Sequence, residues 1–348
     1  MRVLVTGAGG LIGSEAAFHW INSGDVVHGI DNNTRMSLFG KGGDVTPVIS
    51  SLSRNSNYIH HNISITDRDA VLDAIKKIQP DLIIHAAAQP SHDKAADIPF
   101  EDFNINANGT LNLLEATRIH ARDSVFIHVS TNKVYGDGPN HLSLKETEKR
   151  YDFSDAEYQN GIRENFSIDS CLHSLFGASK ASGDLLAQEY GRYFGMKVGV
   201  FRGGCLTGPQ HAGVELHGFL SYIVKCAVEG KKYRIFGYKG KQVRDQIHCR
   251  DVITCFERFY QAPKFGEVYN LGGEKKNSAS IIEIIERISD LTGHELDHEY
   301  VDKNRIGDHI CYYTDMSKFK KDYPGWEIST SLDDIILEIF EAVKNRHV

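Results

Sequence analysis

The sequence predicts an α/β protein built on a doubly wound parallel sheet, with a smaller α/β lobe toward the carboxyl terminus. Three observations predict this fold. Apolar runs typical of buried strands alternate with helical patterns over the first 135 residues. A glycine-rich turn, Gly7–Gly13, joins the first strand to the first helix. Polar residues gather at Ser130–Gly136, directly after a later apolar strand, and open parallel sheets bind ligands at that edge.

Composition and charge exclude several classes of protein. The 348 residues can bury one large core, or a nucleotide-binding core with a smaller lobe. A net charge of -7 argues against nucleic acid or an anionic membrane surface as the main partner. No apolar run approaches the roughly 20 residues that span a bilayer, and the amino terminus is already strand and turn, so we expect no signal peptide and a cytoplasmic protein. The six cysteines show no C-x-x-C spacing, so neither a metal site nor a disulfide framework is expected.

The glycine-rich turn has the spacing of a dinucleotide site. It follows a strand at residues 2–6 and leads into a helix expected at residues 14–22. Gly7 permits the tight turn, Gly10 lets the backbone approach a pyrophosphate, and Gly13 lets helix and strand pack closely. The free N–H groups at Leu11 and Ile12 would then face the phosphates at the helix amino terminus.

An acidic residue ends the second predicted strand. Residues 26–30 form an apolar run, and Asp31 follows it, 18 residues after Gly13. A carboxylate at this position accepts hydrogen bonds from both ribose hydroxyls and repels a 2′-phosphate. The sequence therefore favours NAD over NADP, with a capping role for Asp31 as the alternative.

The remaining elements alternate as a doubly wound sheet requires. In order, we expect a surface loop with a helical piece at 34–57, a strand at 57–60, a helix at 67–77 capped by Asp67, a strand at 81–88 and an amphipathic helix at 104–120. Alanines 86–88 let a backbone pass close to a cofactor, although plain tight packing explains them nearly as well.

The second half of the chain is less regular. Residues 137–172 are polar and predict a loop over the site, followed by a helix at 174–192 that carries Lys180 and a strand at 197–202. From there to about residue 330 the elements become shorter and mixed. We therefore expect an NAD-binding domain at 1–202 and a mainly substrate-binding lobe at 203–348, interleaved with the sheet.

Together these landmarks resemble the extended branch of the short-chain dehydrogenase/reductase family. The matching motifs are Gly7–Gly13, Asp31, His85–Ala88, Asn106–Thr110, Thr131–Gly136, Phe176-x-x-x-Lys180, Arg202–Pro209, Gly240–Asp245, Tyr269–Gly273 and Arg305–Asp308. Within the family, the motifs at 130–136 and 240–245 are most similar to those of the CDP-paratose 2-epimerases.

The resemblance implies a reaction, a cofactor and an assembly. Family members hold NAD tightly and oxidise a hydroxyl of a sugar nucleotide to a ketone. A 2-epimerase then returns the hydride to the opposite face of carbon 2, with no net redox change. The resemblance also implies a homodimer that uses the helices at 104–120 and 174–192.

The resemblance also assigns roles to residues. Thr131 would hydrogen-bond the reacting oxygen, and Lys180 would hold the nicotinamide ribose and lower the pKa of a neighbouring acid/base group. Further cofactor contacts would come from Asn32, Asn62, Ile63, Ala86, Ala87, Ala88 and Asn106. Asn132, Lys133 and Cys205 would line the sugar site. Arg244 and Arg305 would grip the pyrophosphate, since the guanidinium fork suits it; surface ion pairs are the alternative for both.

One departure from the family pattern bears on catalysis. The family has Tyr-x-x-x-Lys, and here Phe176 stands where the tyrosine transfers the proton. The change could be engineered, the protein could bind without turnover, or another group could carry the proton. Candidates are His173, whose ordinary pKa near 6.5 suits proton exchange, Cys171, a tyrosine of the 137–172 loop, or a water held by Thr131. A lone histidine is more often structural, and Cys171 is the weaker candidate of the two.

Two further departures and the rival functions remain. Asn62 replaces an acid of many relatives and can still accept a hydrogen bond, and Cys205 replaces an asparagine. A 4-epimerase or decarboxylase is a neighbouring possibility. A 4,6-dehydratase usually has Asp-Glu where this chain has Asn132 and Lys133, which argues against that reaction. The rival from another class is a catalytically silent protein that binds NAD.

Overall fold

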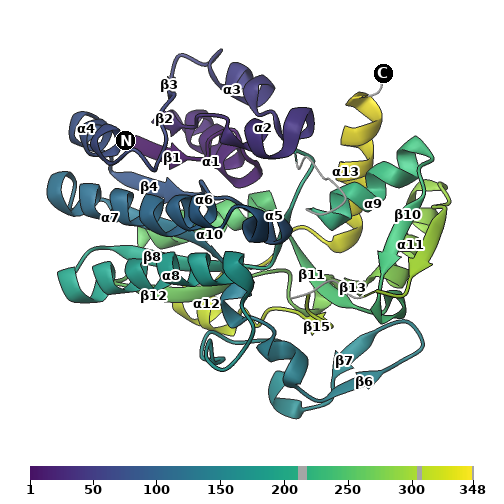
Figure 1. Ribbon diagram of the computed structural model, residues 1–348. Coiled ribbons are helices and arrows are strands. Elements are labelled where there is room, and N and C mark those ends of the chain that lie inside the picture. Colours follow the sequence, from purple (N-terminus) through teal and green to yellow (C-terminus); the bar gives the residue numbers. More distant parts are fainter. Residues whose placement is uncertain (211–217, 304–307, 347–348) are drawn as a thin grey trace. The chain divides into compact units, whose positions relative to one another are not determined.

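The computed structural model describes residues 1–210, 218–303 and 308–346 (Figure 1). The chain forms two compact units. The first contains Met1–Val134, Leu175–Arg202 and Val252–Tyr269; the second contains Tyr135–Ser174, Gly203–Asp251 and Asn270–Val348. The sequence predicted one boundary, after residue 202. The chain does pass from the first unit to the second there, but it also crosses at four other points.

The first unit is built on the predicted doubly wound sheet. Its seven strands lie in the order β12-β8-β5-β4-β1-β2-β3. Their bounds are β1 Arg2–Thr6, β2 Val26–Ile30, β3 Tyr58–His61, β4 Leu82–His85, β5 Val125–Thr131, β8 Val198–Gly203 and β12 Glu267–Leu271. The pairings β1–β2, β2–β3, β1–β4 and β4–β5 are parallel. Strand order reverses between β1 and β4, and crevices for ligands open at such a point.

Helices of the first unit cover the sheet. They are α1 Leu11–Asn22, α2 Thr34–Phe39, α3 Thr46–Leu52, α4 Arg68–Ile78, α5 His92–Asp97, α6 Pro99–Phe103, α7 Gly109–His120, α8 Ser174–Phe194 and α10 Cys249–Gln261. Asp67 caps α4 as predicted, accepting from the Ala70 amide at 3.1 Å. Figure 1 shows α7 and α8 side by side, and their buried residues share one core with Phe126 of β5.

Three local predictions need correction. Residues 34–57 were expected to be mainly loop, but they form α2, a 3₁₀ turn at Gly40–Gly43 and α3, where Pro47 occupies the first turn and favours helix. The strand expected at 81–88 ends at His85. The helix expected at 104–120 is preceded by α6 and by one π-helical turn at Asn104–Asn108, a local widening that often occurs at functional sites.

Within its described residues, the second unit combines short strands with four α-helices. β11 Val243–His248 pairs in parallel with β9 Cys205–Thr207 and β15 Cys311–Tyr312, and antiparallel with β13 Ser278–Ser280. Two further pairs are β10 Tyr233–Phe236 with β14 His298–Val301, and the hairpin β6 Leu144–Glu146 with β7 Tyr151–Phe153. Its helices are α9 Phe219–Glu229, α11 Ile281–Thr292, α12 Ser317–Asp322 and α13 Leu332–Arg346. α9, α11 and α13 share a core.

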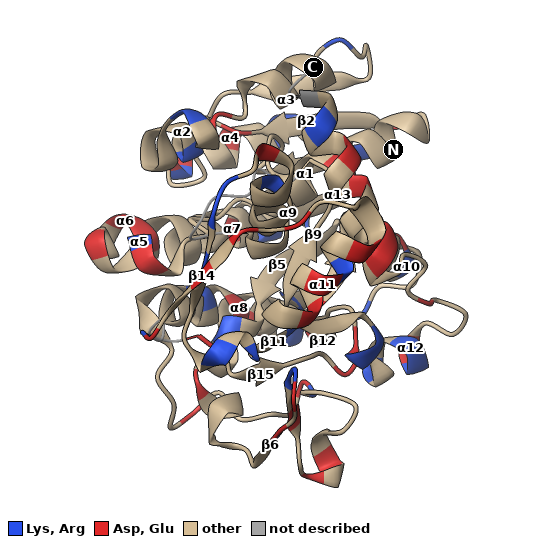
Figure 2. Cartoon of the chain, turned by 90° about the vertical axis from the view of Figure 1, so that its right-hand side faces the viewer, with Lys and Arg blue, Asp and Glu red and all other residues tan. Residues whose placement is uncertain are grey.

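Charged residues of both signs are interspersed along the elements of each unit (Figure 2). Among the helices that the structure describes, none combines the length and the apolar character that crossing a bilayer requires.

A buried ion pair joins α8 to β8 within the first unit. The Asp184 carboxylate accepts from Arg202 Nε at 3.0 Å and Nη2 at 2.9 Å, and the two side chains are 1% and 5% exposed. It also accepts from Ser130 Oγ at 2.6 Å and Gln188 Nε2 at 2.6 Å. One carboxylate therefore fixes the end of β5, the end of β8 and the middle of α8.

Removing one partner of this pair should destabilise the protein strongly. We expect Arg202→Met to lower the free energy of unfolding by about 3–5 kcal/mol, because an uncompensated carboxylate stays buried. The double variant Asp184→Leu/Arg202→Met should recover most of that loss. Lys77→Met removes an exposed pair with Asp73 and should cost less than about 1 kcal/mol. Urea unfolding checks this; an Arg202→Met loss as small as that of Lys77→Met contradicts it.

Candidate active site

The glycine turn requires glycine at its first and last positions. Gly7 has a φ of +69°, and a Cβ there would lie 2.8 Å from the Ala87 amide nitrogen. A Cβ on Gly13 would lie 2.0 Å from the Gly7 carbonyl oxygen. The turn therefore packs directly against Ala86 and Ala87 after β4, at the point where strand order reverses.

The helix that follows the turn begins with uncapped amides. α1 starts at Leu11, three residues earlier than predicted, and its N-cap, Gly10, provides no side-chain hydrogen bond. The first N–H groups of a helix have no partner within the helix. The amides of Leu11 and Ile12 are therefore placed as an anion site requires.

Asp31 anchors the glycine turn. Its Oδ2 accepts from the Gly9 amide at 2.9 Å, and its Oδ1 accepts from the Asn33 amide at 2.8 Å. Each carboxylate oxygen has a second lone pair, so these bonds leave acceptor capacity at the carboxyl end of β2. Asn32 is exposed, and its Oδ1 accepts from the amide and hydroxyl of Thr34. After β3, Asn62 is exposed and Ile63 is partly buried.

Asn106 lies at the centre of a buried network at the carboxyl edge of the sheet. Its Oδ1 accepts from the Gln89 amide at 3.0 Å, and its Nδ2 donates to Asp102 Oδ1 at 3.0 Å and to Ser179 Oγ at 3.1 Å. The network joins the exit of β4, the π-helical turn and α8. The sequence pointed to Asn106 but not to its partners; only Ser179 carried a signal, as the neighbour of Lys180 in the Phe-x-x-x-Lys motif.

Thr131 is the last residue of β5, and Lys180 contacts the same end of that strand. The Lys180 ammonium group donates to the Val129 carbonyl at 2.8 Å, and the Lys133 amide donates to Thr131 Oγ1 at 3.2 Å. Asn132 is buried next to Thr131. Burial lowers the pKa of Lys180 to about 8, with the charges of Asp184 and Asp102 opposing the shift.

Phe176 lies one turn before Lys180 on α8 and is 8% exposed. Residues four apart lie on the same face of a helix, so its ring belongs to the face that carries Lys180. A phenyl ring has no hydroxyl, and this position can therefore neither donate nor accept a proton.

Two buried histidines lie side by side on β4 and β5. His85 Nδ1 lies 2.8 Å from Thr6 Oγ1, and its Nε2 lies 3.0 Å from Thr110 Oγ1. The rings of His85 and His128 are 5.3 Å apart, and within the described residues neither ring nitrogen of His128 has a hydrogen-bond partner. Burial holds the pKa of both imidazoles well below the ordinary 6.5. The family motif at 85–88 includes His85, but its pairing with His128 was not predicted.

The predicted substrate residues that the structure describes beyond residue 202 lie in the second unit. Arg244 on β11 is largely buried. Its Nη2 donates to Asp308 Oδ1 at 2.8 Å, and its Nη1 donates to the carbonyl of the preceding residue, Val243, at 2.7 Å. Cys205 on β9 pairs with Gln246, two residues after Arg244. Arg305 lies outside the described residues.

Two candidate proton carriers also lie in the second unit. Cys171 Sγ lies 3.6 Å from His173 Nε2, and burial raises the pKa of the Cys171 thiol, which keeps it protonated. The structure thus assigns His173 to the second unit, and Thr131, Phe176 and Lys180 to the first.

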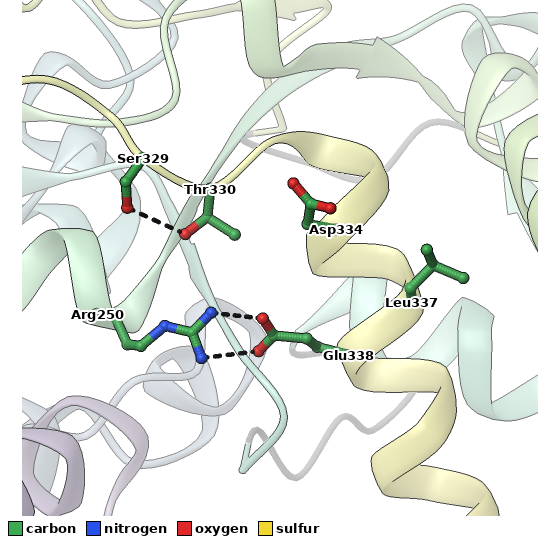
Figure 3. A pocket seen from close by; sticks show the side chains of 6 residues that line it. All are labelled: Arg250, Ser329, Thr330, Asp334, Leu337 and Glu338. Carbon is green, nitrogen blue, oxygen red and sulfur yellow. Dashed lines mark hydrogen bonds and ion pairs between the residues drawn. The ribbon is translucent and has the colours of Figure 1, made fainter.

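An open pocket of about 320 Å³ in the second unit has a different character (Figure 3). Its lining residues are Arg250, Ser329, Thr330, Asp334, Leu337 and Glu338. Arg250 donates to both carboxylate oxygens of Glu338, so its charge is paired within the pocket, and the Asp334 carboxylate accepts from the Ser331 hydroxyl. None of the residues that the sequence predicts for the site lines this pocket.

Comparison with known proteins places these features in a family. The model of the NAD dependent epimerase/dehydratase family matches residues 3–272. The CDP-paratose 2-epimerase of Salmonella typhi is 35% identical over 297 residues, which cover 83% of this chain and 84% of that protein. The dTDP-glucose 4,6-dehydratase of Haemophilus influenzae is 30% identical over 347 residues, 96% of this chain and 90% of that protein. The UDP-glucuronic acid 4-epimerase of Bacillus cereus, solved with UDP-glucuronic acid and NAD, superposes with a TM-score of 0.81 at 27% identity, covering 99% and 100% of the chains.

The histidine pair should make the protein sensitive to acid. Because the pKa of each imidazole is lower in the folded state, the unfolded chain binds more protons as pH falls below about 6.5, and stability falls with it. We expect the urea midpoint to decrease between pH 7 and pH 5, and to decrease less in His128→Leu. An equal decrease in parent and variant would show that His128 does not contribute.

Proposed function

The chain belongs to the NAD-dependent epimerase/dehydratase family, and we propose that it epimerises a nucleotide-diphosphate sugar at carbon 2 of a CDP-deoxyhexose. The hydroxyl is oxidised to a ketone, and the hydride returns to the other face. The observation that carries the proposal is the buried Lys180, hydrogen-bonded to the Val129 carbonyl two residues before Thr131 at the end of β5, in a chain 35% identical to CDP-paratose 2-epimerase.

The residues present fit NAD, the cofactor of the family. When bound, NAD supplies the hydride acceptor and donor. The uncapped amides at the start of α1 suit its pyrophosphate, and the spare acceptor capacity of Asp31 suits its ribose hydroxyls. The residues proposed to hold it are Gly7, Gly10, Leu11, Ile12, Asp31, Asn32, Asn62, Ile63, Ala86, Ala87, Ala88, Asn106 and Lys180.

The residues proposed for the substrate come from the family motifs. Thr131 hydrogen-bonds the reacting oxygen, and Asn132 and Lys133 contact the sugar. In the second unit Arg244 binds the pyrophosphate and Cys205 lines the sugar site; Arg305 is proposed for the pyrophosphate from its motif alone. A polar side chain fixed by backbone contacts, as Arg244 is by Val243, loses little freedom on binding and so supports this role.

Two alternative functions have separate support, one from Phe176 and one from the similar structures. Without the usual phenol, the protein could be a silent NAD-binding protein, and the 4-epimerase among the similar structures keeps another sugar-nucleotide reaction open.

We also propose a homodimer through α7 and α8. Exposed apolar side chains on and beside these helices support it, including Phe103, Ile119, Leu185 and Tyr193.

Two glycine variants separate folding from cofactor binding. A Cβ on Gly10 meets only the Gly7 carbonyl, at 3.3 Å, so we expect Gly10→Ala to fold but to bind NAD at least tenfold more weakly, because the methyl group occupies the side from which phosphate approaches. Gly13→Ala should lose both stability and binding. Calorimetry with NAD and thermal melts check this. Full NAD affinity in Gly10→Ala would show that the phosphates do not bind at this turn.

Turnover should be visible by NMR in D₂O with CDP-, UDP- and GDP-sugars. We expect inversion at carbon 2 of a CDP-sugar with retention of its hydrogen, because the hydride leaves and returns without exchange. Thr131→Ala should lose roughly 10²–10³ in rate, and Thr131→Ser, which keeps the hydroxyl, should lose far less. Inversion at carbon 4 would establish the alternative reaction; no change with any sugar, together with normal NAD binding, would establish the silent protein.

A further inference from the structure

We propose that the ε-amine of Lys180 itself takes and returns the proton of the sugar hydroxyl, in place of the phenol that Phe176 lacks. This inference rests on the proposed function, since it needs a hydroxyl to be oxidised. It differs from the family role of the lysine, which is to hold the ribose and to act on a neighbouring tyrosine.

The Lys180 amine is buried with a single hydrogen bond. Its side chain is 4% exposed, and among the described residues its one partner is the Val129 carbonyl, at 2.8 Å. A carbonyl can accept from a neutral amine as well as from an ammonium group, although the bond from the ammonium group is stronger. An ammonium group has three donors to satisfy, whereas a neutral amine keeps a lone pair free, so this environment does not require the charged form.

Neither nearby carboxylate is bound to Lys180. Asp184, one turn later on α8, is committed to Arg202, Ser130 and Gln188. Asp102 on α6 accepts from Gln89 Nε2 at 2.7 Å and from Asn106 Nδ2 at 3.0 Å. Their charges act on Lys180 from a distance, but no described carboxylate forms the contact ion pair that fixes a buried lysine in its charged form.

The other groups that face Lys180 are neutral or paired. His85 is held between two threonine hydroxyls, and His128 on β5 is uncharged because it is fully buried. The charge of Arg202 on β8 is paired with Asp184. Desolvation therefore outweighs the attraction of the two acids, and the pKa of Lys180 falls to about 8. A base with a pKa near the working pH is suited to proton transfer.

The step balances in both directions. In oxidation, the carbon–hydrogen bond gives its hydride to NAD, the hydroxyl oxygen forms the carbonyl, and its proton passes to the neutral amine. In reduction, the hydride returns to the other face of the carbonyl, and the Lys180 ammonium group returns the proton to oxygen. Thr131 holds that oxygen in both steps. Because the ring of Phe176 has no group that titrates, the Lys180 amine carries the proton on this face of α8.

The first test measures Lys180 without substrate or cofactor. In protein labelled with ¹³C-lysine, the Cε resonance that disappears in Lys180→Arg should titrate with a midpoint near pH 8. Lys149, whose pKa is raised by its exposed pair with Glu286, provides the control resonance and should not titrate in this range. A Lys180 resonance that stays unchanged to pH 10 overturns the proposal.

The second test uses turnover. The pH profile of kcat/KM should rise through the midpoint found for Lys180, and Lys180→Arg, which keeps the charge but cannot release its proton, should lose roughly 10²–10⁴ in rate. In Phe176→Tyr, where a phenol can take over, the profile should depart from that midpoint. A parent profile that does not follow the Lys180 titration, or a Lys180→Arg loss below tenfold, overturns this proposal alone; no turnover of any nucleotide sugar overturns the proposed function with it.

Discussion

The first unit depends on the hydrogen bonds and the ion pair that the Asp184 carboxylate makes. The carboxylate is used by Arg202, Ser130 and Gln188, so it fixes α8 against β5 and β8 without pairing with Lys180. The same bonds therefore hold Lys180 at the strand end and leave its amine without a contact counter-ion. Had Asp184 formed an ion pair with Lys180, the pKa of the lysine would not fall to about 8, and the Arg202 guanidinium would be buried alone.

A second constraint is steric. Where strand order reverses, the turn after β1 and the segment after β4 approach so closely that Gly7 leaves no room for a side chain beside Ala87. Asp31 then holds the turn by the Gly9 amide. These contacts place the amino terminus of α1, the end of β2 and the exit of β4 around one edge, which is what a dinucleotide requires of this fold.

The features that the sequence predicted well are local and periodic. The strand alternation, the Gly7–Gly13 turn and the Asp67 cap each depend on neighbouring residues, so their pattern is visible in the chain. The helices of residues 34–52 were underestimated because a polar, glycine-rich composition hid the start signal of Pro47. Most partners of Asn106, and the pairing of His85 with His128, could not be predicted, because these contacts join buried polar residues from distant segments. The site roles themselves came from family resemblance and stay proposals.

The interleaving of the two units has a consequence for synthesis. The first unit takes its last segment, Val252–Tyr269, from beyond two of the three segments of the second, and that segment includes most of the edge strand β12. A nascent chain on the ribosome therefore cannot complete the NAD-binding sheet until about three quarters of the protein has left the exit tunnel. Domains usually fold as units during translation, amino-terminal first. Here β8 remains an unpaired edge of the sheet until β12 has been synthesised, and chaperones bind surfaces of this kind.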